Sequence, residues 1–337
     1  MIDFRSDTLT RPTAAMKEAM MSAEVGDDVF GEDPSINTLE KTAAALFAKE
    51  AALFCPSGTM TNQIAIKTHT QPGDEVICSD LAHVYIYEGG GMAFNSGCQG
   101  RPVTGDRGRI TAAQLLAVIN PLDDHKAATS LVCLENTANR GGGSCYDLTE
   151  ISRIRQVCQE HHLKLHLDGA RLFNALVATG QTALQYGEQF DSISVCLSKG
   201  LGCPVGSILL GDRDFIREAR RVRKKFGGGM RQAGFLAAAG IYALNNHIDR
   251  LQEDHDHAKQ IALTLDRKDF TEKILPVETN IIIFELRGSM DSRKFTELLA
   301  REGIRVMPIS PLQVRLVTHL DITPEMVETT CKVIRNL

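Results

Sequence analysis

The chain has 337 residues, of which 43% are hydrophobic and 23% are charged, and its formal net charge at pH 7 is −5. This length can bury a large core in one or two domains, and the composition is ordinary for a soluble globular protein. The negative charge gives no general attraction for nucleic acid or an anionic membrane. The N-terminus lacks an apolar signal segment and no apolar run reaches membrane-spanning length. We therefore expect a cytoplasmic protein with no nucleic-acid or membrane partner.

The cysteines indicate the same compartment. Nine cysteines occur, an odd number, and no two are spaced as Cys-x-x-Cys. Cys55, Cys78, Cys133 and Cys196 lie within apolar, strand-like runs. We therefore expect buried free thiols in a reducing environment and no disulfide framework.

Strand and helix patterns alternate through the first two thirds of the chain. A helix is predicted from the turn at 56–59 to about His69, and another from Ile151 to His161. The predicted strands are the short apolar runs at 51–55, 76–78, 131–134, 163–167, 190–197 and 206–210. Such alternation predicts an α/β fold with a mostly parallel sheet covered by helices on both faces. In sheets of this kind, ligands bind at the carboxyl ends of the strands.

The last third of the chain has a different pattern. We predict one long helix from Met230 to about Ala258, and then the strands and helices of a small α+β domain. These later elements are strands at 280–284 and 313–317 and helices at 293–302 and 323–337. The predicted organisation is an N-terminal segment, residues 1–25, a large domain, residues 26–250, and a small C-terminal domain, residues 251–337.

Two polar side chains stand at the ends of predicted buried strands. Lys199 follows the run at 190–197 and is followed at once by glycine, and Asp168 ends the run at 163–167. A lysine near low-dielectric surroundings loses its proton more readily and can then form a Schiff base with a carbonyl. A lysine imine and an aspartate facing a pyridine nitrogen are the pair that pyridoxal phosphate requires. Taken alone, however, Ser-Lys-Gly is most often an ordinary surface turn.

Four further features are candidate binding residues. The first three have both a functional and a structural interpretation, and the fourth has an unusual position. Ser57, Gly58 and Thr59 open a helix after a strand, as either a phosphate cradle or an ordinary N-cap. His83 either stacks on a planar cofactor ring or is a structural residue. Arg315 lies in an apolar strand, where it binds either a substrate carboxylate or a structural acidic partner. Arg171 falls at a helix start, where the dipole disfavours a cation and so indicates a nearby anionic group.

The run Asp254-His255-Asp256-His257 offers side chains of the kind that bind metal ions. It lies on a strongly charged predicted helix, and such a run is usually a solvated face. We therefore expect no metal site.

A series of short motifs runs in order along the chain: Asp3–Thr8, Val25–Gly31, Pro56–Thr59, Ala82-His83 with Tyr85, Glu88–Gly90, Leu134–Thr137, Leu167–Arg171, Cys196–Gly206, Gly227–Gln232 and Val314–His319. In this combination the chain resembles the threonine aldolase family, of the low-specificity L-threonine aldolase kind, over essentially its whole length. The resemblance implies the fold-type I architecture of pyridoxal-phosphate enzymes. It also implies a homotetramer, a dimer of dimers, with active sites at the dimer interface.

The resemblance implies roles for residues around the cofactor ring. Lys199 matches the lysine that forms the internal aldimine with pyridoxal phosphate. Asp168 matches the carboxylate that keeps the pyridine nitrogen protonated, and His83 matches the histidine stacked on the ring. Arg171 matches an arginine near the phenolic oxygen of the cofactor and the substrate carboxylate.

The remaining implied roles concern the cofactor phosphate and the substrate. Gly58 and Thr59, with Ser57 beside them, match phosphate-binding positions. Lys224 and Arg231 match basic residues that are lent to the phosphate of the neighbouring subunit. Substrate contacts are implied for three more positions: Ser6 and Arg315 match groups that hold the substrate carboxylate, and His125 matches a histidine near the substrate hydroxyl.

The implied reaction is the retro-aldol cleavage of L-threonine and L-allo-threonine, small amino-acid substrates, to glycine and acetaldehyde. The amino acid displaces Lys199 from the cofactor, a base removes the β-hydroxyl proton, and the Cα–Cβ electrons flow into the pyridinium ring. The candidate bases are His83, His125, a water held by them, and Lys199. Many relatives have a histidine where this chain has Ala138, which leaves the preference between the two substrates open.

Two alternatives share Lys199 and Asp168. One is another fold-type I lyase or an aminotransferase acting on a small amino acid. The other is a pyridoxal-phosphate-binding protein without strong catalysis, which has no need of the carboxylate-binding pair Ser6 and Arg315.

Overall fold

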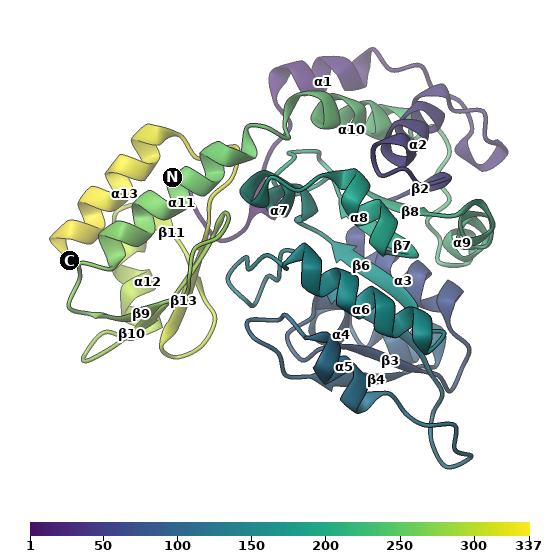
Figure 1. The fold of residues 1–337 in the computed structure, drawn as a ribbon. Helices are drawn as coiled ribbons and strands as arrows, with labels where there is room; N and C mark the ends of the chain where they lie inside the picture. The colour runs from purple at the N-terminus through teal and green to yellow at the C-terminus, as the bar shows by residue number, and fades with distance from the viewer.

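A computed structural model describes all residues, 1–337 (Figure 1). Its largest element is a seven-stranded sheet of order β2-β8-β7-β6-β5-β3-β4. The strands are β2 (Ala51–Cys55), β3 (Glu75–Ser79), β4 (Gln99–Val103), β5 (Thr129–Glu135), β6 (Lys164–Gly169), β7 (Ser192–Cys196) and β8 (Ser207–Gly211). Only β8 runs opposite to the other six strands, so the predicted mostly parallel sheet is confirmed.

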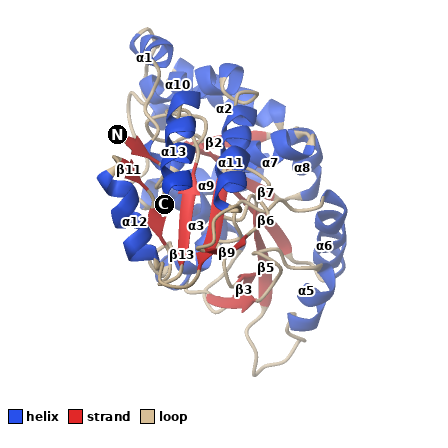
Figure 2. Ribbon diagram, turned by 90° about the vertical axis from the view of Figure 1, so that its left-hand side faces the viewer, coloured by secondary structure: helices blue, strands red, loops and turns tan.

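Helices cover both faces of this sheet, whose strands lie between them in Figure 2. The helices α5, α6 and α8 lie in front of the sheet in Figure 1, and α3 lies behind it, where it packs against α9. The helices of the large domain are α1 (Ala14–Met21), α2 (Pro34–Leu46), α3 (Gly58–His69), α4 (His83–Ile86), α5 (Ala112–Val118), α6 (Leu148–Glu160), α7 (Leu172–Thr179), α8 (Ala183–Gln189), α9 (Arg213–Lys225) and α10 (Gly234–Asn246).

Local sequence explains where several of these helices begin. Asp33 caps α2 through hydrogen bonds from the backbone N–H groups of Ser35 and Ile36, and Pro34 occupies the first helical position. Ser57 caps α3, because its Oγ accepts a hydrogen bond from Met60 N at 3.2 Å. A small polar side chain at this position satisfies a backbone donor that the helix itself leaves free.

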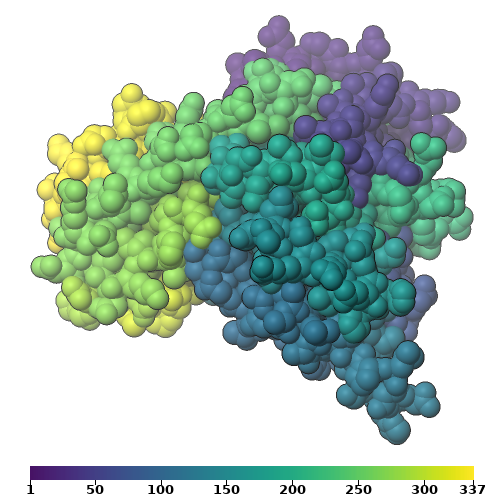
Figure 3. Space-filling view, viewed as in Figure 1, coloured from purple at the N-terminus to yellow at the C-terminus, as the bar shows by residue number.

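The C-terminal part forms a second lobe, coloured green and yellow in Figure 3. A four-stranded antiparallel sheet of order β12-β13-β10-β9 forms its centre, and three helices pack with it. These elements are β9 (Thr271–Ile274), β10 (Ile281–Leu286), β12 (Met307–Pro308), β13 (Gln313–Val317), α11 (Leu251–Leu265), α12 (Ser292–Arg301) and α13 (Pro324–Asn336).

The start of the chain packs with this second lobe. Strand β1 (Ile2–Asp3) pairs in parallel with β11 (Ile304–Arg305), and Phe4 is buried in the apolar cluster formed by residues 258–334. The chain then continues to α1, which packs against α10 on the large domain. The first residues therefore contact both parts of the molecule.

The prediction of one helix from Met230 to Ala258 is wrong. Helix α10 ends at Asn246 and α11 begins at Leu251. His247 stands at the break, where it is buried and its Nδ1 donates to the backbone carbonyl of Leu201 at 2.8 Å. This contact holds the end of α10 against the loop after β7, while the chain turns toward the small domain.

Two other features differ from the sequence analysis. Strand β4 was not predicted, because it lies at the sheet edge and only Val103 of its residues is buried. The run at 254–257 is not a fully solvated face, because Asp254 and His255 are buried. Arg250 donates two hydrogen bonds to Asp254, and His255 Nε2 lies 3.2 Å from the amide of Asn174 on α7.

All nine cysteines are free and buried, which confirms the predicted thiols. Burial raises the pKa of Cys55 and of Cys145 to about 12. These two thiols are therefore protonated and shielded near neutral pH. No helix combines the length and the apolar character that crossing a membrane requires.

Candidate active site

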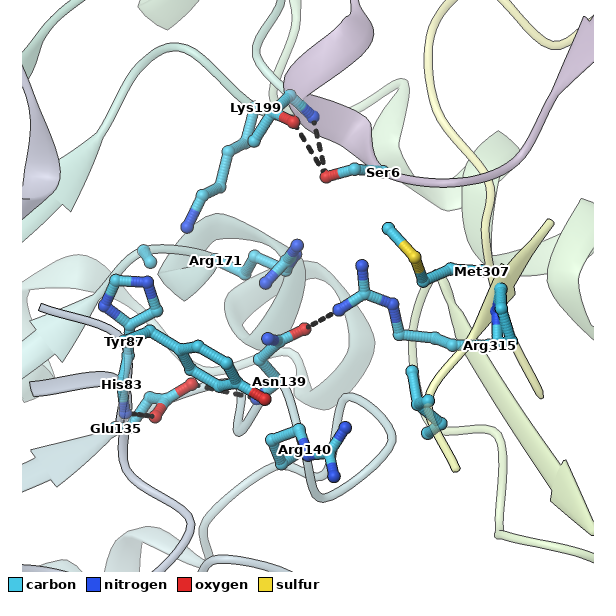
Figure 4. A pocket seen from close by; sticks show the side chains of 14 residues that line it. Ser6, His83, Tyr87, Glu135, Asn139, Arg140, Arg171, Lys199, Met307 and Arg315 are labelled. Carbon is cyan, nitrogen blue, oxygen red and sulfur yellow. Dashed lines mark hydrogen bonds between the residues drawn. The ribbon is translucent and has the colours of Figure 1, made fainter. Parts of the chain in front are cut away.

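A pocket of about 460 Å³ lies where the N-terminal segment, the large domain and the small domain meet (Figure 4). The large domain contributes His83, Tyr87, Glu135, Asn139, Arg140, Ala170, Arg171 and Lys199. The N-terminal segment adds Ser6 and Thr8, and the small domain adds Met307, Pro308, Ile309 and Arg315. Five residues that the sequence analysis selected, Ser6, His83, Arg171, Lys199 and Arg315, therefore line one pocket.

The parallel sheet explains how distant residues meet here. Glu135 is the last residue of β5 and Asp168 lies near the end of β6, and the two are paired in register. Lys199 follows β7, the next strand in the sheet, and His83 follows β3. Because the carboxyl ends of parallel strands lie at the same edge, these side chains are brought to one place.

Asp168 is not one of the lining residues, but it lies close to His83, which is. The ring nitrogen of His83 and the carboxylate oxygens of Glu88 and Asp168 lie within 4.8 Å of one another. His83 Nδ1 is 2.9 Å from Glu88 Oε1, and Asp168 is buried and accepts a hydrogen bond from Asn62 Nδ2 at 2.9 Å. Burial lowers the pKa of His83, but the Glu88 hydrogen bond and the nearby carboxylates outweigh it and raise the pKa overall.

The group His83, Glu88 and Asp168 also has the composition of a metal site. The Glu88 carboxylate, however, already accepts several hydrogen bonds from protein side chains. Glu88 accepts from His83, from Asn62 Nδ2 at 2.9 Å and from Gln63 Nε2 at 2.6 Å. Carboxylates that are buried and bonded in this way hold neighbouring side chains in place.

Arg171 has an acidic partner that the sequence analysis did not identify. Its Nε and Nη2 donate to the two carboxylate oxygens of Asp7, each at 2.7 Å. Both side chains are buried. Burial raises the pKa of Asp7, but the Arg171 charge and hydrogen bonds outweigh it and hold the pKa at about 2. Arg171 thus lies at the pocket as a firmly oriented cation.

Arg315 differs from Arg171, because no acidic side chain pairs with it. Its Nη1 donates to Asn139 Oδ1 at 2.8 Å and its Nη2 to the backbone carbonyl of Arg5 at 2.9 Å, while its Nε is buried without a partner. Burial first, and then the charge of Arg171, lower the pKa of Arg315 to about 10. A half-buried guanidinium beside a second cation, with no acidic partner, favours an anion in the pocket.

Glu135 lines the same pocket and has an unusual environment. It accepts hydrogen bonds from His83 N at 2.8 Å and from Asn139 N at 2.9 Å. Burial and then the negative charge of Asp168 raise the pKa of Glu135 to about 7, although both backbone hydrogen bonds oppose the shift. In the sequence, Glu135 is part of the motif Leu134–Thr137. The pattern of the strand does not indicate that its carboxyl is buried next to Asp168.

The expected phosphate-binding residues are not among those that line this pocket. Ser57 and Thr59 are exposed at the N-terminus of α3, and Gly58 is half-buried. Lys224 and Arg231 are exposed as well, and Arg231 Nη1 contacts Asp27 Oδ2 at 2.8 Å. None of these side chains is brought to the pocket within the single chain.

His125 does not line the pocket either. It belongs to the segment 119–128 between α5 and β5, which projects from the large domain in Figures 1 and 3. Its side chain is 93% exposed, and its only contacts of note are with Asp123. Contact of His125 with a substrate would therefore require a second subunit.

The comparisons with known proteins agree with this geometry. The sequence model of the beta-eliminating lyase family matches residues 3–289. The low specificity L-threonine aldolase of Escherichia coli K12 is 44% identical over 326 residues, which is 96% of this chain and 96% of that protein.

Solved structures show the same fold. The threonine aldolase of Leishmania major has a TM-score of 0.88 at 21% identity, covering 100% of this chain and 99% of that one. A solved SPT structure that holds PLP has a TM-score of 0.75 at 16% identity, covering 99% and 86%. These neighbours confirm the predicted fold-type I architecture. From the family match and the full-length identity, the chain belongs to the beta-eliminating lyase family and, within it, to the low-specificity L-threonine aldolases.

Proposed function

We propose that the chain is a pyridoxal-phosphate-dependent aldehyde-lyase that cleaves L-threonine and L-allo-threonine to glycine and acetaldehyde. One observation carries the proposal: a lysine amine and two guanidinium groups, those of Lys199, Arg171 and Arg315, line one small pocket. The amine can bind the aldehyde of the cofactor. The cations can bind the carboxylate of an amino-acid substrate. The names of the full-length relatives support the same substrate.

The residues present fit the cofactor. The Lys199 amine makes no hydrogen bond or ion pair with other side chains, and the buried Asp168 carboxylate lies within 4.8 Å of the ring nitrogen of His83. We assign Lys199 to the cofactor aldehyde, Asp168 to its pyridine nitrogen and His83 to its ring face. The exposed start of α3, at Ser57, Gly58 and Thr59, supplies backbone N–H groups for the phosphate. When bound, pyridoxal phosphate supplies an electron sink for the bond that breaks.

Arg315 and Ser6 orient the substrate. Arg315 keeps a guanidinium without an acidic partner at the pocket, and the Ser6 hydroxyl accepts hydrogen bonds from Thr8 N at 3.2 Å and Thr8 Oγ1 at 2.9 Å. The Ser6 O–H is thereby left to donate to a carboxylate oxygen. Arg171 adds positive charge from a fixed position, because Asp7 holds its other side. Two carboxylate oxygens held in this way restrict rotation of the substrate about its Cα atom.

His83 is the group that we assign to the β-hydroxyl proton. Its Nδ1 is held by Glu88, which leaves Nε2 available to the pocket. Glu88 and the nearby Asp168 stabilise the protonated ring, so His83 can take up a proton and return it. His125, the other histidine candidate, can act only from a neighbouring subunit.

We further propose that the chain forms a homotetramer with shared sites in the cytoplasm. Lys224 and Arg231 are exposed away from their own pocket, as residues lent to a partner would be. Large apolar side chains are also exposed, among them Tyr85, Ile86, Phe94 and Tyr87, of which Tyr87 lines the pocket. Exposed apolar groups of this size favour burial against another protein surface. The free, buried cysteines suit a reducing compartment.

The test is aldehyde release after reconstitution with pyridoxal phosphate. L-threonine, L-allo-threonine and their two D-enantiomers are compared, with release expected from the L-forms only. Lys199→Ala should lose both turnover and the visible absorption of the lysine-bound cofactor. Keto acid and ammonia as products would favour the alternative lyase or aminotransferase, and full activity of Lys199→Ala would refute the proposal.

A further inference from the structure

The face of the sheet behind Asp168 is polar where an apolar layer would be expected. His166 and Asp168 are two residues apart on β6, so their side chains point to the same face. Ser192 of β7 is paired with His166 in register, and helix α3 covers this face with Asn62. These four side chains are buried. Buried polar groups are destabilising unless they are hydrogen-bonded, so their partners are informative.

The partners form one continuous chain. Asn62 Nδ2 contacts Asp168 Oδ2 at 2.9 Å, and Asn62 Oδ1 lies 3.1 Å from His166 Nε2. His166 Nδ1 lies 2.8 Å from Ser192 Oγ, which in turn lies 2.8 Å from Nε2 of His69 at the C-terminal end of α3. We name these four residues, Asn62, His166, Ser192 and His69, the Asp168 relay.

The donor and acceptor of each hydrogen bond in the relay can be assigned by starting from Asp168, the acid that the relay contacts. Ionised carboxylates only accept, so Asn62 presents its amide N–H groups to Asp168 and Glu88. The carbonyl oxygen of Asn62 then accepts from His166 Nε2–H. A neutral imidazole has one N–H, so His166 Nδ1 accepts from the Ser192 hydroxyl. Ser192 Oγ accepts in turn from His69 Nε2–H.

Both histidines of the relay are held neutral. Burial lowers the pKa of His166 to about 3 and that of His69 to about 4. His69 also stacks on Phe215, with ring centroids 4.4 Å apart. Since neither ring gains a proton near neutral pH, the donors of the relay keep one direction over the working range of the protein.

We infer that the Asp168 relay is a positioning device that holds the Asp168 carboxylate in place, aimed at the pyridine nitrogen of the cofactor. The inference rests on the proposed function. Every donor in the relay points toward Asp168, so each hydrogen bond fixes the orientation of the next side chain and, at the end, that of the carboxylate. The second amide N–H of Asn62 reaches Glu88, which holds His83. Asn62 therefore joins the two groups assigned to the ring, Asp168 and His83.

The first test compares two replacements of one residue. His166→Leu keeps much of the side-chain volume but leaves Asn62 Oδ1 buried without a donor, so the amide is free to turn. His166→Gln retains an N–H close to the original Nε2. We expect kcat to fall about ten-fold or more in His166→Leu and to stay within about three-fold of wild type in His166→Gln. The pH titration of the visible absorption of the lysine-bound cofactor should shift in His166→Leu only.

The second test uses a matched pair of serines on β7. Ser192→Ala breaks the relay, whereas Ser194→Ala breaks a buried hydrogen bond of 2.6 Å to Thr61 on the same helix, outside the relay. Both serines are buried and lie on the same face, so loss of packing is comparable. We expect the cofactor titration and kcat to change in Ser192→Ala and not in Ser194→Ala, with thermal unfolding reporting that both variants fold.

The outcomes separate the inference from the function on which it depends. Wild-type protein that neither absorbs visibly with pyridoxal phosphate nor releases aldehyde refutes the proposed function and the inference with it. An active wild type whose Ser192→Ala and Ser194→Ala variants behave alike refutes the relay alone. A His166→Gln variant as impaired as His166→Leu also contradicts the relay, because its donor would then be irrelevant.

Discussion

Asp7 and Arg171 are joined by two parallel hydrogen bonds of 2.7 Å across 164 residues of sequence, with both side chains buried. The pair connects the N-terminal segment to the loop between β6 and α7 and leaves Arg171 at the pocket. An exposed ion pair of this kind contributes little to stability, but a buried one becomes strongly destabilising when one partner is removed.

We therefore expect Asp7→Asn to lower the free energy of unfolding by about 3 kcal/mol or more, because it leaves the Arg171 charge buried without compensation. The measurement is urea unfolding of the cofactor-free protein at neutral pH. Asp3→Asn, which removes a half-buried partner of Arg5, is the matched control and should change stability by less than about 1 kcal/mol. Equal effects of the two substitutions would contradict a special role for the buried pair.

The same pair has a signature at acid pH. The pKa of Asp7 in the folded protein is about 2, below its ordinary value of 3.8. The contribution of Asp7 to stability is thus present above that ordinary value and is lost as the pH falls toward about 2. It amounts to about 2 kcal/mol in wild type. In Asp7→Asn this part of the acid-induced loss should be missing, and an unchanged acid slope would show that Asp7 is not the group responsible.

Arg315→Lys should weaken substrate binding although it keeps the charge. A lysine cannot donate to Asn139 and to a carboxylate with the same planar geometry. We expect the KM for L-threonine to rise about 30-fold, with a smaller effect on kcat. Arg305→Lys, an exposed arginine of the same domain, serves as the control. If KM is the same in both variants, Arg315 does not hold the substrate carboxylate.

The two histidine candidates can be separated directly. His83→Phe keeps a flat ring for stacking but cannot carry a proton, so kcat should fall about 100-fold while the cofactor still binds. His125→Ala removes an exposed side chain that contacts only its own loop, and kcat should stay within about three-fold. The reverse result would mean that the segment 119–128 reaches the pocket of a neighbouring subunit and that His125 acts there.

Glu135 should make stability fall as the pH rises. Its pKa in the folded protein is about 7, above the ordinary 4.5, so the unfolded chain releases the proton first. The neutral carboxyl contributes to the stability of the folded protein at a pH below its ordinary pKa of 4.5. This contribution is lost as the pH rises through about 7. Cofactor-free wild type should therefore lose stability between about pH 5 and about pH 8, and Glu135→Gln should lack this part. Parallel unfolding curves of the two proteins against pH would contradict the raised pKa.

Much of the site was predictable because its residues follow strands. An apolar run that ends in a polar residue is a local pattern, and parallel strands bring such ends to one edge. This reasoning led to Lys199 and Asp168, and both lie at the carboxyl end of the sheet. Arg315 was predicted from a charge within an apolar strand, and it lines the same pocket.

Other residues could not be predicted, because their importance depends on partners far away in the chain. Asp7 was part of a motif, but nothing local shows that it binds Arg171. His166 reads as one polar residue within a strand, and its role depends on Ser192 across the sheet and Asn62 above it. The break at His247 depends on the Leu201 carbonyl, so helical periodicity alone runs through it.

The sequence by itself determined the alternation of strands and helices, the polar residues at strand ends and the family, because each is carried by neighbouring residues. Tertiary structure decided which charges pair, which are left for an anion, and which buried polar groups form the relay behind Asp168. The physical reason is that sheet order and register set these contacts. They place residues such as Asp7 and Arg171 side by side through packing of the whole chain, which no short segment encodes.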